Sequence, residues 1–120
     1  MKNKTLVLGA SETPTRYSYL AVNKLRDHNH EVLAIGKKAG KVRDVEIQTA
    51  RIPTEDVNTV TLYLNPLHQQ PYYDYILSLK PKRIIFNPGA ENEELEAIAE
   101  KNGIKAMEAC TLVLLSTGQF

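Results

Sequence analysis

The chain has 120 residues, of which 42% are hydrophobic and 24% charged, proportions typical of a globular protein with room for one core. Its formal net charge of +1 is too small to create the field that DNA, RNA or a membrane surface requires. No basic stripe interleaved with aromatic residues is present either. Composition therefore predicts a single domain and argues against nucleic acid as a partner.

The first residues carry no pattern of a targeting signal. Met1 is followed by basic residues, but the apolar run behind them is too short for a signal peptide, and no stretch approaches a membrane span. We therefore expect a cytoplasmic protein without a membrane partner. The single cysteine, Cys110, cannot form an internal disulfide, and without further cysteines or clustered histidines it predicts no metal site.

Apolar runs of strand length recur along the chain and alternate with segments long enough for helices. Parallel strands need crossover connections, which are almost always right-handed, so this alternation predicts helices on both faces of a parallel sheet. The expected fold class is α/β: a doubly wound parallel sheet of about five strands in a single three-layer domain. The five runs are residues 6–8, 32–35, 60–64, 83–86 and 104–107.

Three of the connecting segments have helical features. A first helix is predicted over residues 17–28, before Asn29, and a later crossover over residues 66–81 ends at Pro81. In that crossover the stripe formed by Tyr73, Ile76 and Leu77 is expected to face the sheet. A further helix is predicted over residues 92–102, where Asn92 is the candidate N-cap and glycine follows the last turn.

Two segments are less regular. Residues 36–56 are too polar for a full helix, so we expect a loop in place of a crossover helix, with a short edge strand over residues 45–49. The tail, residues 111–120, contains an apolar run at 112–115 that fits either a last helix or a last strand. The same run suits a lid on the core or a contact in a homodimer.

The turn after the first strand is the strongest candidate for a ligand site. A strand that ends in a glycine turn and leads into a helix points backbone N–H groups and the positive end of the helix dipole at one place, which suits phosphate. The spacing is not G-x-G-x-x-G, because serine and proline stand at positions 11 and 14. The hydroxyls of Ser11 and Thr13 and the guanidinium of Arg16 would instead add side-chain donors for the phosphate. The alternative is that Ser11 and Thr13 only cap the helix. The candidate residues are Gly9, Ala10, Ser11, Thr13, Pro14 and Arg16.

The end of the second strand reads Gly36-Lys37-Lys38, where folds that bind nicotinamide dinucleotides usually place an acid for the ribose hydroxyls. Two lysines without an acid suit a ligand with an extra phosphate on its adenosine ribose. Coenzyme A, with a 3′-phosphate, and NADP, with a 2′-phosphate, both meet this condition. The alternative is a solvated loop.

Taken in order, these motifs resemble the small stand-alone CoA-binding domain proteins of bacteria, which are similar to the CoA-binding domain of the succinyl-CoA synthetase alpha subunit. The resemblance spans nearly the whole chain. It is carried by Gly9-Ala10-Ser11-x-x-Pro14, Arg16-Tyr17-Ser18, Glu31-Val32, Asn65-Pro66, Asn87-Pro88-Gly89-Ala90, Asn92-Glu93-Glu94 and Cys110.

The resemblance implies a Rossmann-like domain that holds CoA across the carboxyl ends of its strands. Residues 9–13 would then lie on the pyrophosphate, and Lys37 and Lys38 near the 3′-phosphate. The remaining implied contacts are Leu64, Asn65 and Pro66 along the adenine, and Asn87, Pro88 and Gly89 along the pantetheine arm. The sequence departs from the family at Gly36-Lys37-Lys38, where an Asn-Pro turn is more usual, and in the Leu-Asn-Pro-Leu-His run that follows the third strand.

Two further side chains have an active and a passive interpretation. His68 could touch the adenine or act as a general base, or it could be a solvated loop residue. Cys110 could form a mixed disulfide with the CoA thiol, or it could be a small buried apolar residue. No catalytic residue is predicted, and the glutamates around Asn92 fit a solvated helix face.

Three functions remain open from the sequence. The leading hypothesis is a non-catalytic module that binds CoA or an acyl-CoA. The first alternative is an NADP-dependent oxidoreductase, although no Tyr-x-x-x-Lys pair is present. The second is a sensor of a nucleotide or sugar phosphate that acts through a protein partner.

Overall fold

The computed structural model describes residues 4–120. They form one sheet with the strand order β3-β4-β2-β1-β5-β6-β7, in which β3 is antiparallel to β4 and the other pairings are parallel. The strands are β1 (Lys4–Leu8), β2 (Glu31–Ile35), β3 (Gly40–Val42), β4 (Val45–Gln48), β5 (Val57–Leu62), β6 (Arg83–Phe86) and β7 (Lys105–Glu108). The α/β class is therefore confirmed, and the sheet is mostly parallel.

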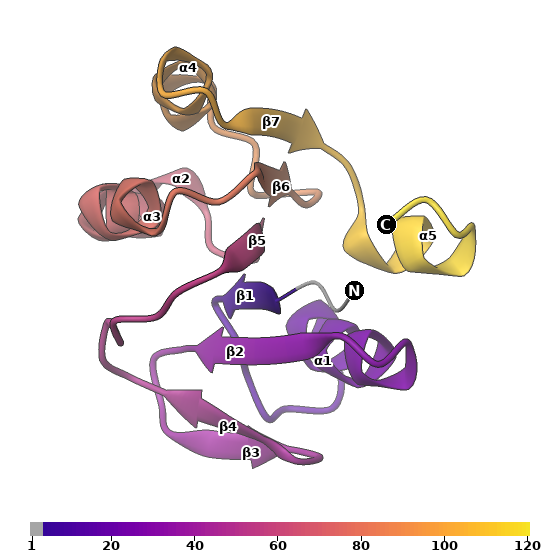
Figure 1. Cartoon of the computed structure of the whole chain (residues 1–120). Coiled ribbons are helices and arrows are strands. Elements are labelled where there is room, and N and C mark those ends of the chain that lie inside the picture. The colour runs from indigo at the N-terminus through magenta and orange to yellow at the C-terminus, as the bar shows by residue number, and fades with distance from the viewer. Residues whose placement is uncertain (1–3) are drawn as a thin grey trace.

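Helices cover both faces of this sheet, as Figure 1 shows. On one side lie α1 (Tyr17–Asp27) and α5 (Thr111–Ser116), and on the other lie α2 (Pro66–Gln69), α3 (Tyr73–Leu79) and α4 (Glu93–Lys101). Side chains alternate between the faces along each strand, so β1 buries Leu6 and Leu8 under α2–α4, and Val7 under α1 and α5. Burial on both faces explains why the central strands read as continuous apolar runs.

The prediction of about five strands was wrong, because the sheet has seven. Residues 36–56, expected as a loop with one edge strand, form a hairpin in which the expected strand is β4 and the additional strand is β3. Val42, Val45 and Ile47 of this hairpin are buried against the α1 side of the core. Three apolar positions within six residues are too short a pattern to predict a hairpin from sequence.

Ion pairs fix the hairpin to α1. Arg26 of α1 forms a bidentate pair with Asp44, with Nε–Oδ1 and Nη2–Oδ2 distances of 3.0 and 2.9 Å, and this pair lowers the pKa of the Asp44 carboxyl. In a second pair the arginine is on the hairpin and the acid is on α1: Arg43 Nη1 lies 2.5 Å from Oδ1 of Asp27. The partners are far apart in the sequence, so the anchoring depends on the tertiary structure.

The predicted crossover over residues 66–81 is helical but interrupted. A 3₁₀ turn, η1 (Gln70–Tyr72), joins α2 to α3 at Pro71, which lacks the N–H that a continuous α-helix would need there. Ile76 is fully buried and Tyr73 and Leu77 pack against the same core, so the predicted stripe does face the sheet. The helix predicted over residues 92–102 is also confirmed, because Asn92 caps α4 by accepting a hydrogen bond from the amide of Leu95.

The tail folds as the helix α5, so of the helix and the strand that the sequence allowed, the helix is formed. Leu114 and Leu115 are buried, whereas Val113 on the outer side is 56% exposed. The apolar run therefore covers the core of its own chain. Among residues 4–120, no helix has the length and apolar character needed to cross a bilayer.

Candidate functional site

The sheet reverses its winding direction at β1, which pairs with β2 on one side and with β5 on the other. The connection after β1 leads to α1 on one face, and the connection after β5 leads to α2 on the opposite face. The two chains therefore diverge where the strands end and leave a crevice at the carboxyl edge. In doubly wound sheets this switch point is where ligands bind.

A hollow of about 360 Å³ lies in this crevice, within the usual range for small-molecule sites. The connections after β1, β5 and β6 each contribute to its wall. It is lined by Gly9, Ser11, Arg16, Tyr17, Ser18, Tyr63, Asn65, Pro88, Gly89 and Ala90.

Gly9 is required by the geometry of the crevice. Its φ is +97°, and a Cβ atom there would lie 3.0 Å from the backbone carbon of Tyr63 and 3.1 Å from the side chain of Leu64. A larger residue would therefore need a strained backbone and would push the exits of β1 and β5 apart. The glycine at position 9 is therefore required by the close approach of the β1 and β5 exits.

Two amides of the first turn are used by the protein itself. Gly9 N and Ala10 N both donate to the carbonyl oxygen of Ile35, at 2.8 and 2.9 Å. The amide of Thr13 donates to Ser11 Oγ at 3.1 Å. The N-cap of α1 is Arg16, without a side-chain cap, so Ser11 and Thr13 do not cap this helix.

Donors for an anion remain further along the same connection. The first amides of a helix have no intrahelical acceptor, and those of α1 belong to Tyr17 and Ser18, both of which line the hollow. Within residues 4–120 the amide of Ser11 makes no hydrogen bond to the protein. With the exposed guanidinium of Arg16, these groups form a donor set on the β1–α1 side of the hollow.

The connections after β5 and β6 are held together by Gln69, which is fully buried. Its Nε2 donates to the carbonyl oxygens of Leu64 and Ala90, both at 2.8 Å. Its Oε1 accepts from Nδ2 of Asn92, which also donates to the hydroxyl of Tyr73. Sequence reasoning missed this residue, since a glutamine in a helix gives no sign that its side chain joins the carbonyl of Leu64 to the distant carbonyl of Ala90.

Asn87 does not line the hollow but is hydrogen-bonded beneath it. Its side chain is 2% exposed; Nδ2 donates to Thr61 Oγ1 at 2.6 Å and to the oxygen of Leu62 at 2.8 Å, while Oδ1 accepts from the amide of Thr111 at 2.9 Å. These bonds join the end of β5 to the start of α5. The side chain is therefore committed to the protein, and the neighbouring Pro88 and Gly89 face the hollow instead.

Tyr63 lines the hollow and was not predicted. Its hydroxyl is buried and has no hydrogen-bond partner among the described residues, and burial raises its pKa to about 12. Thr61 and Thr111 lie near enough to moderate this shift, but their hydroxyls bond each other at 2.7 Å. Tyr63 is therefore a neutral phenol whose ring forms part of the wall.

The structure gathers seven of the seventeen predicted site residues around the hollow. Those that line the hollow are Gly9, Ser11, Arg16, Tyr17, Asn65, Pro88 and Gly89, and the lining residues that were missed are Ser18, Tyr63 and Ala90. The remaining candidates lie outside the lining: Ala10, Thr13, Pro14, Gly36, Lys37, Lys38, Leu64, Pro66, His68 and Asn87.

Lys37 and Lys38 still belong to the same edge of the sheet. They follow β2 after Gly36, are exposed, and form no ion pair with the described part of the chain. His68 is exposed on α2, and Cys110 is partly exposed just before α5. No group of three or more metal-ligating side chains is found among residues 4–120.

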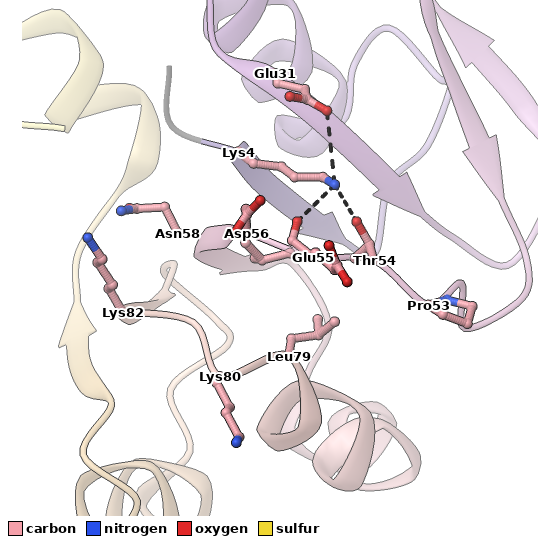
Figure 2. Close-up of a pocket in the computed structure, with 11 residues that line it drawn as sticks. Lys4, Glu31, Pro53, Thr54, Glu55, Asp56, Asn58, Leu79, Lys80 and Lys82 are labelled. Carbon is pink, nitrogen blue, oxygen red and sulfur yellow. Dashed lines mark hydrogen bonds and ion pairs between the residues drawn. The ribbon is translucent and has the colours of Figure 1, made fainter. Parts of the chain in front are cut away.

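A wider hollow of about 1220 Å³ opens at the opposite edge, where the strands begin (Figure 2). Its most central cation, Lys4, donates to Thr54 Oγ1 and to the carbonyl oxygen of Glu55, and lies 4.0 Å from the carboxylate of Glu31. Lys80 extends away from this group. Because Lys4 is already paired and parallel α/β sheets bind ligands at their carboxyl edge, the smaller hollow is the candidate site.

The fold and the crevice place the chain in the class of Rossmann-like α/β domains. The family model described as a CoA binding domain matches residues 3–116. The chain therefore belongs to the CoA binding domain family, and the resemblance found in the sequence is confirmed.

Solved structures share this fold. The crystal structure of an uncharacterized protein is 53% identical with a TM-score of 0.97, and the match covers 100% of this chain and 99% of that one. The protein described as cell-free ID.343 from Thermus thermophilus is 20% identical with a TM-score of 0.87, and the match covers 99% of this chain and 91% of that one. A conserved hypothetical protein from Pyrococcus furiosus is 23% identical with a TM-score of 0.79, covering 92% and 97%. These last two show the fold alone. Comparison with curated proteins gives no match.

Proposed function

We propose that this protein binds coenzyme A, or an acyl-CoA, across the carboxyl edge of its sheet and acts as a non-catalytic binding or regulatory module. The observation that carries the proposal is the family match over residues 3–116, together with a hollow at the switch point. In this proposal the hollow receives the centre of the ligand, and the two ends extend along the edge.

The pyrophosphate is assigned to the β1–α1 connection. The amides of Ser11, Tyr17 and Ser18 supply hydrogen-bond donors, and Arg16 supplies a forked cation suited to two phosphate oxygens. This differs from the sequence prediction in its donors, because Gly9 and Ala10 already bond the oxygen of Ile35.

The two ends of the ligand are assigned to neighbouring connections. Lys37 and Lys38 face the 3′-phosphate, whose charge suits two exposed ammonium groups that form no ion pair within residues 4–120. Asn65 and Pro66 border the adenine, and Pro88 and Gly89 border the pantetheine arm. The thiol or acyl group would then leave the hollow on the side of the β6 exit.

Isothermal titration of the purified protein with CoA, 3′-dephospho-CoA and NADPH tests the proposal. We expect saturable heat with CoA, weaker binding of dephospho-CoA, and a Tm that rises with ligand, since a hundredfold excess over Kd adds about 2.7 kcal/mol to the free energy of unfolding. Saturation by NADPH with no response to CoA would favour the NADP alternative, and the absence of heat with every ligand would refute the proposal.

A pair of charge-removing variants locates the binding. Arg16→Ala should weaken CoA binding about tenfold or more, because it removes a charged partner of the pyrophosphate. Lys101→Ala is the control: it also removes one positive charge, but from the exposed last turn of α4, outside the lining of the hollow. Equal affinities of the two variants would contradict the assignment.

A further inference from the structure

Glu12 lies in the connection between β1 and α1, yet its carboxylate reaches the β3–β4 hairpin. Its Oε2 accepts a hydrogen bond from the amide of Lys41 at 3.2 Å. At the neighbouring Gly40, an added Cβ would lie 2.6 Å from the same oxygen, so the missing side chain leaves the space that the carboxylate occupies. In Figure 1 the violet connection from β1 to α1 runs past β2 toward this hairpin.

A second contact joins the same two connections at their other end. Gly36 follows β2, and an added Cβ there would lie 2.2 Å from the carbonyl oxygen of Ala10. In the same corner the oxygen of Ile35 accepts from the amides of Gly9 and Ala10. The backbone is therefore packed directly on backbone at this end, with no room for a side chain.

Lys37 and Lys38 lie between these two attachments. The segment from Gly36 to Lys41 is held within the sheet by the hydrogen bond from Gly36 N to Gln48 O and by the pairing of β3 with β4. It is held to the 9–14 connection by backbone packing against Ala10 at its start and by the carboxylate of Glu12 at its end. Of the two contacts with the 9–14 connection, the carboxylate is the one that a side-chain substitution can remove without altering the β1–β2 corner.

We propose that Glu12 is a positioning residue that fixes the 36–41 connection against the 9–14 connection and so determines where Lys37 and Lys38 present their ammonium groups. This inference rests on the proposed function, because the lysines are assigned there to the 3′-phosphate. It gives Glu12 a role in selectivity for the 3′-phosphate without contact between Glu12 and the ligand.

The sign of the effect separates positioning from electrostatics. A carboxylate on the connection that carries the two lysines opposes the approach of a phosphate, so a purely electrostatic role means that any neutral residue at position 12 strengthens CoA binding. A positioning role means the opposite for alanine, which removes the hydrogen bond to Lys41. Glutamine keeps an acceptor oxygen and should preserve the positioning.

The test compares Glu12→Ala, Glu12→Gln and Gly40→Ala for binding of CoA and of 3′-dephospho-CoA. Glu12→Ala should weaken CoA binding about three- to tenfold and dephospho-CoA binding less than about twofold, as expected for the loss of two exposed charge contacts. Gly40→Ala, whose Cβ displaces the carboxylate, should behave like Glu12→Ala, and Glu12→Gln should stay within about twofold of wild type.

Hydrogen exchange of the Lys41 amide gives a second measurement that needs no ligand. It should be faster in Glu12→Ala and in Gly40→Ala than in wild type, because the amide loses its acceptor. Unchanged exchange in both variants would refute the attachment itself.

The outcomes for the inference and for the proposed function are distinct. If wild type binds CoA but Glu12→Ala weakens both ligands equally, or if both Glu12 variants bind CoA more tightly, the positioning role is wrong and the CoA site stands. If wild type binds neither ligand, the proposed function fails and the role of Glu12 in selectivity fails with it.

Discussion

Replacing Gln69 by leucine tests whether the walls of the hollow depend on one buried side chain. Leucine has a similar size but cannot hydrogen-bond, so the substitution removes the donor to Leu64 O and Ala90 O and the acceptor for Asn92 Nδ2. Asn92 keeps a second partner in the hydroxyl of Tyr73, at 2.8 Å. The cost therefore comes mainly from the two carbonyls.

Leaving a buried polar group without its partner costs about 1–3 kcal/mol. For two carbonyl oxygens, partly offset by the more favourable transfer of leucine from water, we expect Gln69→Leu to lower the free energy of unfolding by about 2–5 kcal/mol. This is a large share of the about 5–15 kcal/mol that stabilises an ordinary domain.

Urea unfolding, fitted with a common m-value, measures this loss. Gln70→Leu is the matched control, since it changes the same side chain one position further along, where it is exposed. The control should stay within about 0.5 kcal/mol of wild type. A loss below about 1 kcal/mol for Gln69→Leu, equal to that of the control, would refute the bridging role.

Three further substitutions test single features of the structure by the same unfolding measurement. Gly36→Ala should cost about 2–4 kcal/mol, because its Cβ meets a backbone oxygen at 2.2 Å, whereas Gly118→Ala, at φ +72° in open space, should cost about 1 kcal/mol; equal costs would contradict this. Tyr63→Phe should be neutral or stabilising by up to about 1 kcal/mol, since the buried hydroxyl has no partner among the described residues, and a clear loss would mean that it has one. Burial first, and then the hydrogen bond and the charge of Glu108, raise the pKa of the Glu96 carboxyl. The stability that Glu96 contributes is therefore present at low pH and falls as the pH rises through that raised pKa. Glu96→Gln should therefore stabilise the protein at pH 7 by up to about 1 kcal/mol and have no benefit at pH 4; a pH-independent effect would contradict this.

The parts of the fold that sequence could predict are those with local causes. Alternating apolar runs and crossover lengths were sufficient for the parallel sheet, and the cap at Asn92 follows from its own hydrogen bond to Leu95 N. The β3–β4 hairpin was missed because its three buried apolar residues form too short a pattern and pack on a distant part of the core, and because its ion pairs are with Arg26 and Asp27 of α1. A short polar segment shows no such partner in the sequence.

The site shows the same limit. Gly9 could be predicted because a glycine turn between a strand and a helix has a local geometric cause. The use of the Gly9 and Ala10 amides by Ile35 O could not, since it depends on the register of β1 against β2. Gln69 bonds the carbonyl of Ala90 and Glu12 bonds the amide of Lys41, both remote in sequence, so only the folded chain reveals these contacts.

The most direct test of the CoA site is a backbone amide NMR titration of the ¹⁵N-labelled protein with CoA. We predict that the largest shifts fall on Ser11, Tyr17, Ser18 and Gly89 at the carboxyl edge, with smaller shifts at the Lys37–Lys38 pair. Shifts concentrated around Lys4 and Lys80 at the opposite edge, or no shifts at millimolar CoA, would contradict a CoA site at the switch point.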